Sequence, residues 1–123
     1  MRIFATKKFY AWAADHDLSD DKLRNAVKEI QDGIVDANLG GSLYKKRVAT
    51  RGRGKSGSVR TLLAYSAGQR TFFLYAFEKG DRANVTHKEK TAMQIVGKEF
   101  LEMSDAELSK RIKSRTIREI KEQ

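Results

Sequence analysis

The chain has 123 residues and a formal net charge of +9 at neutral pH, from 25 Lys and Arg against 16 Asp and Glu. It contains no Cys, which excludes disulfides, thiolate chemistry and Cys-based zinc sites. The length is typical of one domain that buries its own core, so we expect a single domain over residues 1–123, with a helical extension at about 104–123. The sequence shows no secretory signal and no apolar run of the roughly 20 residues that a membrane helix needs. We therefore expect a cytoplasmic protein without a membrane partner.

The positive charge is concentrated in the middle of the chain. Residues 41–82 hold 10 Lys and Arg but only 2 Asp and Glu. Within them, the segment 44–57, YKKRVATRGRGKSG, has six basic residues, three Gly and no acidic residue. Uncompensated charge of this kind raises the local concentration of polyanions, and nucleic acid is the usual partner. A small acidic protein that neutralises the patch is the second candidate.

The first part of the chain predicts a short strand and two helices. Ile3 and Phe4 indicate a brief strand, and residues 8–14 indicate a short helix with apolar side chains on one side. Ser19 is a favourable N-cap for a second helix over residues 20–35, in which apolar residues recur every three or four positions. The Gly pair that follows ends this helix.

Three strands are expected next, separated by short connections. Alternating and β-favouring residues predict strands over residues 42–50, 59–65 and 70–77. The Gly-containing segments 51–57 and 66–69 connect them as a loop and a hairpin turn. The third strand is apolar on both faces, as expected for a central strand covered on both sides. The pattern therefore predicts a three-stranded antiparallel meander.

Two helices are expected after the strands. Thr86 and Glu89 match a capping box, and so do Ser104 and Glu107. The last helix, at about 105–120, is highly charged and has only a thin apolar stripe, so we expect it to dock loosely. Together the elements indicate an α+β fold in which helices are segregated from a small twisted antiparallel sheet.

The chain offers few residues for metal or nucleophilic chemistry. His16 and His87 are the two histidines, and neither has another His at ligand spacing, so we expect both to be exposed polar side chains. The GKS within residues 51–57 lacks the earlier Gly of a phosphate-binding loop and lies between two strands rather than before a helix. No acidic cluster in the basic region could hold Mg²⁺, which disfavours a two-metal nuclease. We expect no metal and no cofactor.

The basic residues on the strands are the remaining candidates. Alternation places Lys45 and Arg47 on one face, and Arg60 can join them from the neighbouring strand. Lys79 and Arg82 follow the third strand. Such a surface can grip a phosphodiester and stabilise the charge that develops when a 2′-OH attacks the adjacent phosphorus, and a Lys crowded by other cations could act as the base. A face that binds phosphates without cutting them is the alternative.

The segment LYKKRVATRGRGKSGSVRTLLAYSAGQRTFFLYAFEKGDRANVTHKE resembles the RelE/ParE superfamily of bacterial type II toxins, in particular its HigB-like RelE branch. The resemblance is carried by the strand LYKKRVA, the loop GRGKSG, the Arg-bearing strand VRTLLAY, the aromatic strand RTFFLYAF, and EKGDRANV before a helix. It covers roughly residues 42–102. The resemblance implies a RelE-like microbial RNase fold, with an N-terminal helical hairpin packed on a small twisted antiparallel sheet and C-terminal helices.

The resemblance also implies a toxin that cuts mRNA in the ribosomal A site by metal-independent 2′-OH attack. A cognate antitoxin, commonly a helix-turn-helix protein, would neutralise it. RelE-type enzymes use basic residues on the second strand, an Arg on the third and basic residues after the fourth. The implied catalytic residues are Lys45, Arg47, Arg60, Lys79 and Arg82. The implied RNA- or ribosome-binding residues are Lys46, Arg51, Arg53, Lys55 and Arg70.

The sequence departs from RelE at one position and leaves other functions open. RelE has a Tyr after the post-strand basic residues, where this chain has Thr86 or its neighbours. Tyr44, Tyr65 or Tyr75 could supply an aromatic ring elsewhere. One alternative function is a non-catalytic nucleic-acid- or partner-binding module, such as an inactive toxin remnant. Another is a ParE-like gyrase inhibitor, although ParE members lack the basic site.

Overall fold

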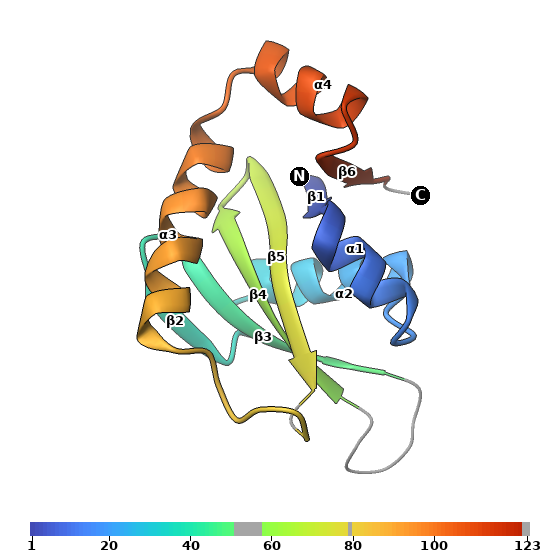
Figure 1. Cartoon of the computed structure of the whole chain (residues 1–123), viewed down its shortest axis with the longest axis vertical. Helices are drawn as coiled ribbons and strands as arrows, with labels where there is room; N and C mark the ends of the chain where they lie inside the picture. The colour runs from blue at the N-terminus through green and yellow to red at the C-terminus, as the bar shows by residue number, and fades with distance from the viewer. Residues whose placement is uncertain (51–57, 79, 122–123) are drawn as a thin grey trace.

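The computed structural model of the chain describes residues 1–50, 58–78 and 80–121. Within these residues the fold is α+β, with one six-stranded mixed sheet and helices on both of its faces (Figure 1). In chain order the elements are β1 (Arg2–Thr6), α1 (Lys7–Ala14), α2 (Asp20–Gln31), β2 (Ala37–Gly40), β3 (Leu43–Ala49), β4 (Ser58–Ser66), β5 (Arg70–Glu78), α3 (His87–Glu102), α4 (Asp105–Lys113) and β6 (Ile117–Ile120).

The sheet has the strand order β2-β3-β4-β5-β1-β6. β3, β4 and β5 form the antiparallel meander that the sequence predicts. β1, however, pairs with β5 in parallel, and β6 pairs antiparallel with β1 (Figure 1). The expectation of a wholly antiparallel sheet was therefore wrong. The strands at the two ends of the chain meet beside the meander, and a pairing between segments so far apart leaves no local sequence pattern.

Helices cover both faces of the sheet. α1 and α2 pack on one face, where the rings of Phe9 and Phe73 stack with their centroids 5.1 Å apart. α3 and α4 pack on the other, where the rings of Phe72 and Phe100 stack at 5.0 Å and Leu108 is fully buried. β5 thus contributes buried aromatic side chains to both layers. The expectation that this strand is central and covered on both sides is confirmed.

The second helix is shorter than the apolar periodicity predicts. Ser19 caps it as expected, but it ends at Gln31 rather than near residue 35. Gly33 adopts a left-handed backbone with φ of 86°, and Ile34 is then 56% exposed instead of continuing the apolar stripe. The chain next forms β2, a four-residue edge strand that pairs with β3. So short a strand, which ends in Gly40 and is followed by Gly41, has too weak a β pattern to predict.

The C-terminal end corrects the expected helix over residues 105–120. α4 ends at Lys113, Arg115 has a left-handed backbone with φ of 64°, and the chain continues as β6. Ile117 and Ile120 are 1% and 2% exposed because β6 delivers them to the cores on opposite faces of the sheet. This segment is part of the core rather than a loosely docked extension.

None of the helices in the described part of the chain has the length and apolar content to span a membrane.

Candidate nucleic-acid interface

Three of the predicted site residues lie together on the face of the sheet that α3 partly covers. In the β3–β4 register Arg47 is directly opposite Arg60, and Lys45 is opposite Leu62. Directly opposed residues of antiparallel strands share a face. Leu62 shares its core cluster with Met93 of α3, so Lys45, Arg47 and Arg60 lie on that same face. The predicted alternation of β3 is confirmed.

The opposition of two Arg side chains is unfavourable for the protein by itself. Like charges directly across a strand pair destabilise a sheet. Arg47 is exposed and Arg60 half-buried, and neither makes an ion pair with any described residue. The only acceptor that the Arg60 guanidinium reaches among the described residues is Ser58 Oγ, at 3.5 Å. An anion bound between the two side chains would remove this repulsion, so the pair suits a phosphate.

Arg82 reaches the same face from the chain after β5, but it is already engaged. Its guanidinium donates to both carboxylate oxygens of Glu89, at 3.0 and 2.6 Å, and to Tyr75 Oη at 3.1 Å. It also lies 5.8 Å from the centroid of the Phe77 ring. Arg82 therefore links the end of the sheet to the start of α3, and a phosphate would have to compete with Glu89 for it.

Glu89 takes part both in the ion pair with Arg82 and in the N-terminal cap of α3. Its Oε1 accepts from the Thr86 N–H at 2.8 Å, while Thr86 Oγ1 accepts from the Glu89 N–H at 3.1 Å, which confirms the predicted capping box. The hydrogen bonds from Arg82, together with the bond from Thr86, lower the pKa of Glu89 to about 2. The same pairing raises the pKa of Arg82.

We expect Glu89→Gln to lower stability at neutral pH and to lose that effect in acid. A carboxyl whose pKa is lowered by folding stabilises the protein above its unfolded pKa, about 4.3. This stabilisation disappears as the pH falls through the folded pKa of about 2. Thermal unfolding of the wild type and Glu89→Gln across this window should therefore show Tm curves that converge in acid. Glu99→Gln, an exposed change on the same helix, is the control. A Tm difference that persists undiminished at the acid end would contradict the role of the ion pair.

Tyr75 is the one of the three candidate tyrosines that lies on the basic face. It is opposite Leu62 in the β4–β5 register, and its hydroxyl accepts from Arg82. Tyr44 and Tyr65 instead make an edge-to-face contact, with centroids 5.7 Å apart, against the core beneath α1 and α2. Alternation along β3 already places Tyr44 on the face opposite Lys45. The choice between Tyr65 and Tyr75 depends on the register between the strands, which alternation within one strand does not give.

Two predicted binding residues have protein partners and lie apart from these three basic side chains. Lys46 is 4% exposed on the opposite face, where its Nζ lies 2.7 Å from Glu29 Oε1 on α2. Arg70, at the start of β5, bonds Asp105 Oδ1 at 2.7 Å and the Met103 carbonyl oxygen, which ties it to the start of α4. Both side chains hold the fold together. The other predicted residues, Lys79, Arg51, Arg53 and Lys55, lie outside the described residues.

The two histidines differ in their surroundings. His87 is exposed at the start of α3, as expected. His16 is only half-exposed: its ring stacks on Trp12 with centroids 3.7 Å apart, and its Nε2 lies 3.6 Å from Glu78 Oε1. The expectation of a fully exposed His16 was therefore wrong. Within the described part of the chain, no group of three or more His, Asp or Glu could hold a metal ion.

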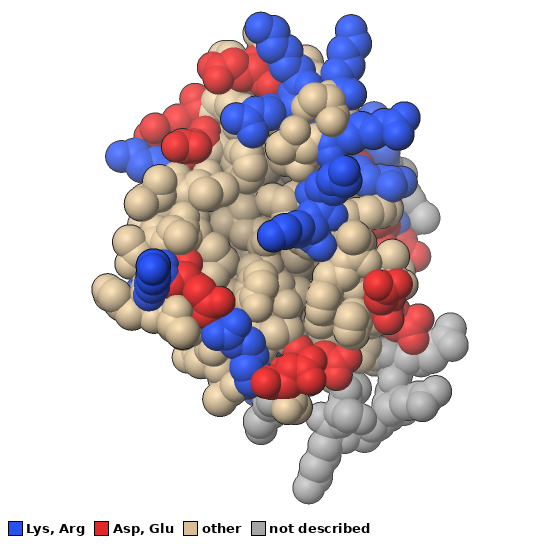
Figure 2. All heavy atoms as spheres, in the orientation of Figure 1, with Lys and Arg blue, Asp and Glu red and all other residues tan. Residues whose placement is uncertain are grey.

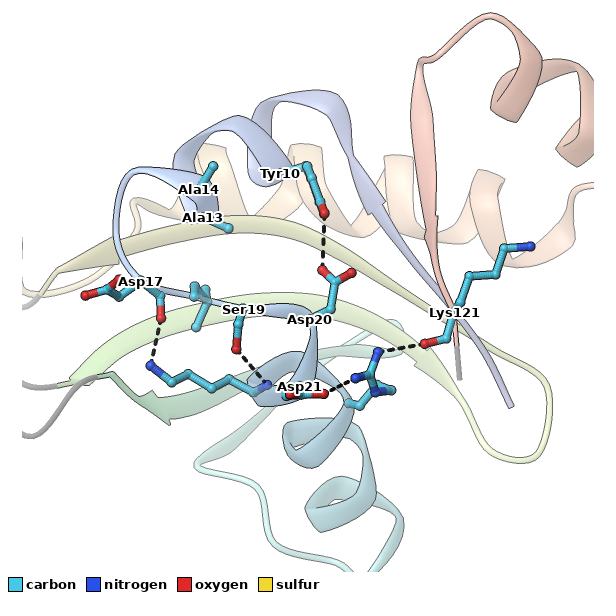
Figure 3. A pocket seen from close by; sticks show the side chains of 11 residues that line it. Tyr10, Ala13, Ala14, Asp17, Ser19, Asp20, Asp21 and Lys121 are labelled. Carbon is cyan, nitrogen blue, oxygen red and sulfur yellow. Dashed lines mark hydrogen bonds and ion pairs between the residues drawn. The ribbon is translucent and has the colours of Figure 1, made fainter. Parts of the chain in front are cut away.

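A hollow of about 940 Å³ lies between α1 and the start of α2, away from the basic face (Figure 3). Its polar side chains bond other groups of the same loop: Tyr10 Oη donates to Asp20 Oδ1 at 3.3 Å, and Lys22 Nζ donates to the backbone carbonyl oxygen of Asp17 at 2.8 Å. These bonds close the loop between the two helices. The hollow is therefore explained by the local fold and adds nothing to the basic face.

The fold and the basic face together define a small α+β protein with a cationic, aromatic-backed sheet surface suited to a phosphodiester backbone. A model of the RelE toxin of the RelE/RelB toxin-antitoxin system matches residues 1–120. The chain therefore belongs to the RelE toxin family. The match extends beyond residues 42–102, the part in which the sequence resembles the RelE/ParE superfamily, and includes α1, α2 and the β1–β6 pair. A comparison with curated proteins found no match.

Proposed function

We propose that this protein is the toxin of a type II toxin-antitoxin system and acts as a ribosome-dependent mRNA endoribonuclease of the HigB-like branch. The observation that carries the proposal is the direct opposition of Arg47 and Arg60 on a face that also presents Lys45. Family membership supports the toxin role and implies an antitoxin partner. The ribosome supplies the substrate, so the proposed site of action is the cytoplasm.

The proposed reaction is an intramolecular transfer that the chain catalyses by charge and position. The ribose 2′-OH attacks the adjacent phosphorus, the bond to the 5′-oxygen breaks, and the products are a 2′,3′-cyclic phosphate and a 5′-OH. A base takes the proton of the 2′-OH, and the leaving 5′-oxygen receives a proton. Arg47 and Arg60 would hold the non-bridging oxygens, whose negative charge grows in the transition state. Lys45 and Lys79 are the candidates for the proton transfers.

Tyr75 is the proposed stacking platform for a base next to the cut. Base–aromatic stacking contributes about 1–3 kcal/mol per base. We expect Tyr75→Leu to raise the KM of cleavage about tenfold or more, which is the lower part of that range expressed as an affinity. Tyr75→Phe keeps the ring and should retain most of the affinity, although it loses the hydroxyl that bonds Arg82. Equal losses in both variants would show that the hydroxyl, not the ring, is what matters.

The same basic face is the proposed site at which an antitoxin neutralises the protein. A bound partner that presents acidic side chains to Arg47 and Arg60 would relieve their repulsion and exclude the message. The helix-turn-helix character of this partner rests on the family resemblance alone. A gene for a small DNA-binding protein beside this one is the expected genomic arrangement.

The test is translation in a cell-free extract with cleavage mapped on the message by primer extension. We expect cuts in ribosome-bound mRNA and an intact naked transcript. Inhibition of translation with intact message would reject the endoribonuclease. Intact message together with gyrase-dependent DNA breaks would favour the ParE-like alternative. Tight, salt-sensitive RNA binding without cuts would favour a non-catalytic module.

A further inference from the structure

Charge alone does not distinguish the basic face from the rest of the surface. Figure 2 shows other Lys and Arg side chains gathered over the part of the molecule where Figure 1 has α4, β6 and α1. A donor stabilises a transition state most when it is held in place before the reaction. The contacts that hold the backbone of Lys45 and Arg47 therefore matter as much as the two positive charges.

At Arg47, β3 has reached the end of its pairing with β2. β4 runs along one side of β3 and places Arg60 opposite Arg47. On the other side, β2 begins at Ala37, which is opposite Lys45. The next backbone N–H on that side, the one of Arg47, therefore lies beyond β2. The repulsion between Arg47 and Arg60 acts at the same point, so this end of β3 needs a further constraint.

Asp36, the residue before β2, supplies that constraint with its side chain and its backbone. Its Oδ2 accepts a hydrogen bond from the Arg47 N–H, and its own N–H donates to the Lys45 carbonyl oxygen at 3.0 Å. The carboxylate thus takes the place that a backbone carbonyl would have in a longer β2. A hydrogen bond to an ionised acceptor is stronger than one between neutral groups. Asp36 therefore extends the pairing of β3 as far as Arg47.

The turn after α2 fixes the position of Asp36. Gly33, with its left-handed backbone, reverses the chain, and the Ile34 N–H donates to the Glu29 carbonyl oxygen at 2.8 Å. Val35 packs against the core on the α1 and α2 face of the sheet. Because Asp36 follows directly, its carboxylate is tied to the core although the residue itself is exposed.

Other residues hold the remaining sides of this part of β3. The side chain of Lys46 points to the opposite face of the sheet, where its Nζ lies 2.7 Å from Glu29 Oε1. Toward β4, the Lys46 carbonyl oxygen accepts a hydrogen bond from Thr61 Oγ1 at 2.8 Å. Glu29 and Thr61 thus fix the strand from below and from β4, whereas the side toward β2 depends on Asp36 at Arg47.

We propose that Asp36 is a positioning residue of the basic face: it holds the Arg47 backbone so that the Arg47 guanidinium meets the phosphate opposite Arg60. This inference rests on the proposed function. Asp36 contacts neither the phosphate nor the ribose and acts through Arg47. What the site requires from Asp36 is its hydrogen bond to the Arg47 N–H rather than its negative charge.

The test compares Asp36→Ala and Asp36→Asn in single-turnover cleavage of mRNA on a programmed ribosome complex. Asp36→Ala removes the acceptor and should lower the rate at saturation about 10- to 100-fold, since a displacement of about 1 Å can reduce a rate about 100-fold. The protein concentration that gives half the maximal rate should change little, because the cations of the face remain. Asp36→Asn keeps an amide oxygen for the Arg47 N–H and should retain most of the rate.

The matched control is Asp32→Ala, which removes the same charge from an exposed position just after α2. The Asp32 side chain makes no hydrogen bond or ion pair with the described residues, so the rate should not change. Equal losses in Asp36→Ala and Asp36→Asn would show that the charge is what matters and would overturn the proposal. An Asp36→Ala protein that cuts as fast as the wild type would also overturn it.

A double-mutant cycle separates positioning from a general loss of stability. In a protein that already carries Arg47→Ala, adding Asp36→Ala should lower the cleavage rate little further, because the residue on which Asp36 acts has lost its guanidinium. A general loss of folded protein would instead lower the rate by the same factor in both backgrounds. Such additivity would contradict a role through Arg47.

Hydrogen exchange of the Arg47 amide, followed by NMR on the free protein, tests the contact without any cleavage. Exchange should be faster in Asp36→Ala than in the wild type and close to the wild type in Asp36→Asn. A wild type that cuts no message rejects the proposed enzyme, and with it the role of Asp36 in cleavage. Unchanged exchange in Asp36→Ala instead rejects the contact itself, so the two failures are distinguishable.

Discussion

Arg60→Ala is expected to lower mRNA cleavage on the ribosome by about 100- to 1,000-fold, the usual effect of removing one charge-stabilising donor from a transition state. The proposed role of Arg60 is to hold a non-bridging phosphate oxygen opposite Arg47. The measurement is single-turnover cleavage of a programmed ribosome complex, with Lys28→Ala as the control for a lost surface charge. Arg47→Ala should behave alike.

Arg60→Ala should not destabilise the fold, and this result would separate a catalytic role of Arg60 from a structural one. Arg60 has no ion pair among the described residues and lies directly opposite Arg47. Its removal eliminates a like-charge repulsion, so the Tm should stay the same or rise. Stability sacrificed for function is common at active sites. A fall in Tm that parallels the fall in cleavage would refute this account of the pair.

Ile117→Ala is expected to cost about 2–5 kcal/mol of unfolding free energy, the usual range for truncating a fully buried aliphatic side chain. Ile117 is 1% exposed because β6 places it against Phe4 and Leu108 in the core beneath α4. Ile95→Ala is the matched control, since Ile95 is 58% exposed and its truncation should change stability by no more than about 0.5 kcal/mol. Denaturant unfolding of both variants gives the comparison.

This pair of variants also tests the C-terminal topology directly. A loosely docked terminal helix would make the two truncations similarly mild. A strand paired with β1 makes only the Ile117 change severe. Near-equal unfolding free energies would therefore argue against the β1–β6 pairing. A large difference would establish that the C-terminal segment holds the sheet together.

Arg82 is in a different situation from Arg47 and Arg60. Its pairing with Glu89 and Tyr75 makes it a clamp between the sheet and α3 in the described structure. If Arg82 contacts phosphate during the reaction, its ion pair with the phosphate must take the place of its ion pair with Glu89. The sequence grouped Arg82 with the other basic residues. It did not predict the pairing with Glu89, because that pairing depends on where the chain turns after β5 to begin α3.

The local sequence determined the strands of the meander, the helix caps and the side from which Lys45 and Arg47 project, because backbone alternation and capping depend on near neighbours. Tertiary structure decided what depends on distant pairings. It brought Arg60 opposite Arg47, turned the chain end at Ile117 into a strand beside β1, and gave Lys46 and Arg70 protein partners. A sequence records that a residue is basic, whereas register, burial and the nearest carboxylate determine whether its charge remains free for a ligand. Here those three factors leave Arg47 and Arg60 facing each other and bury Lys46 against Glu29.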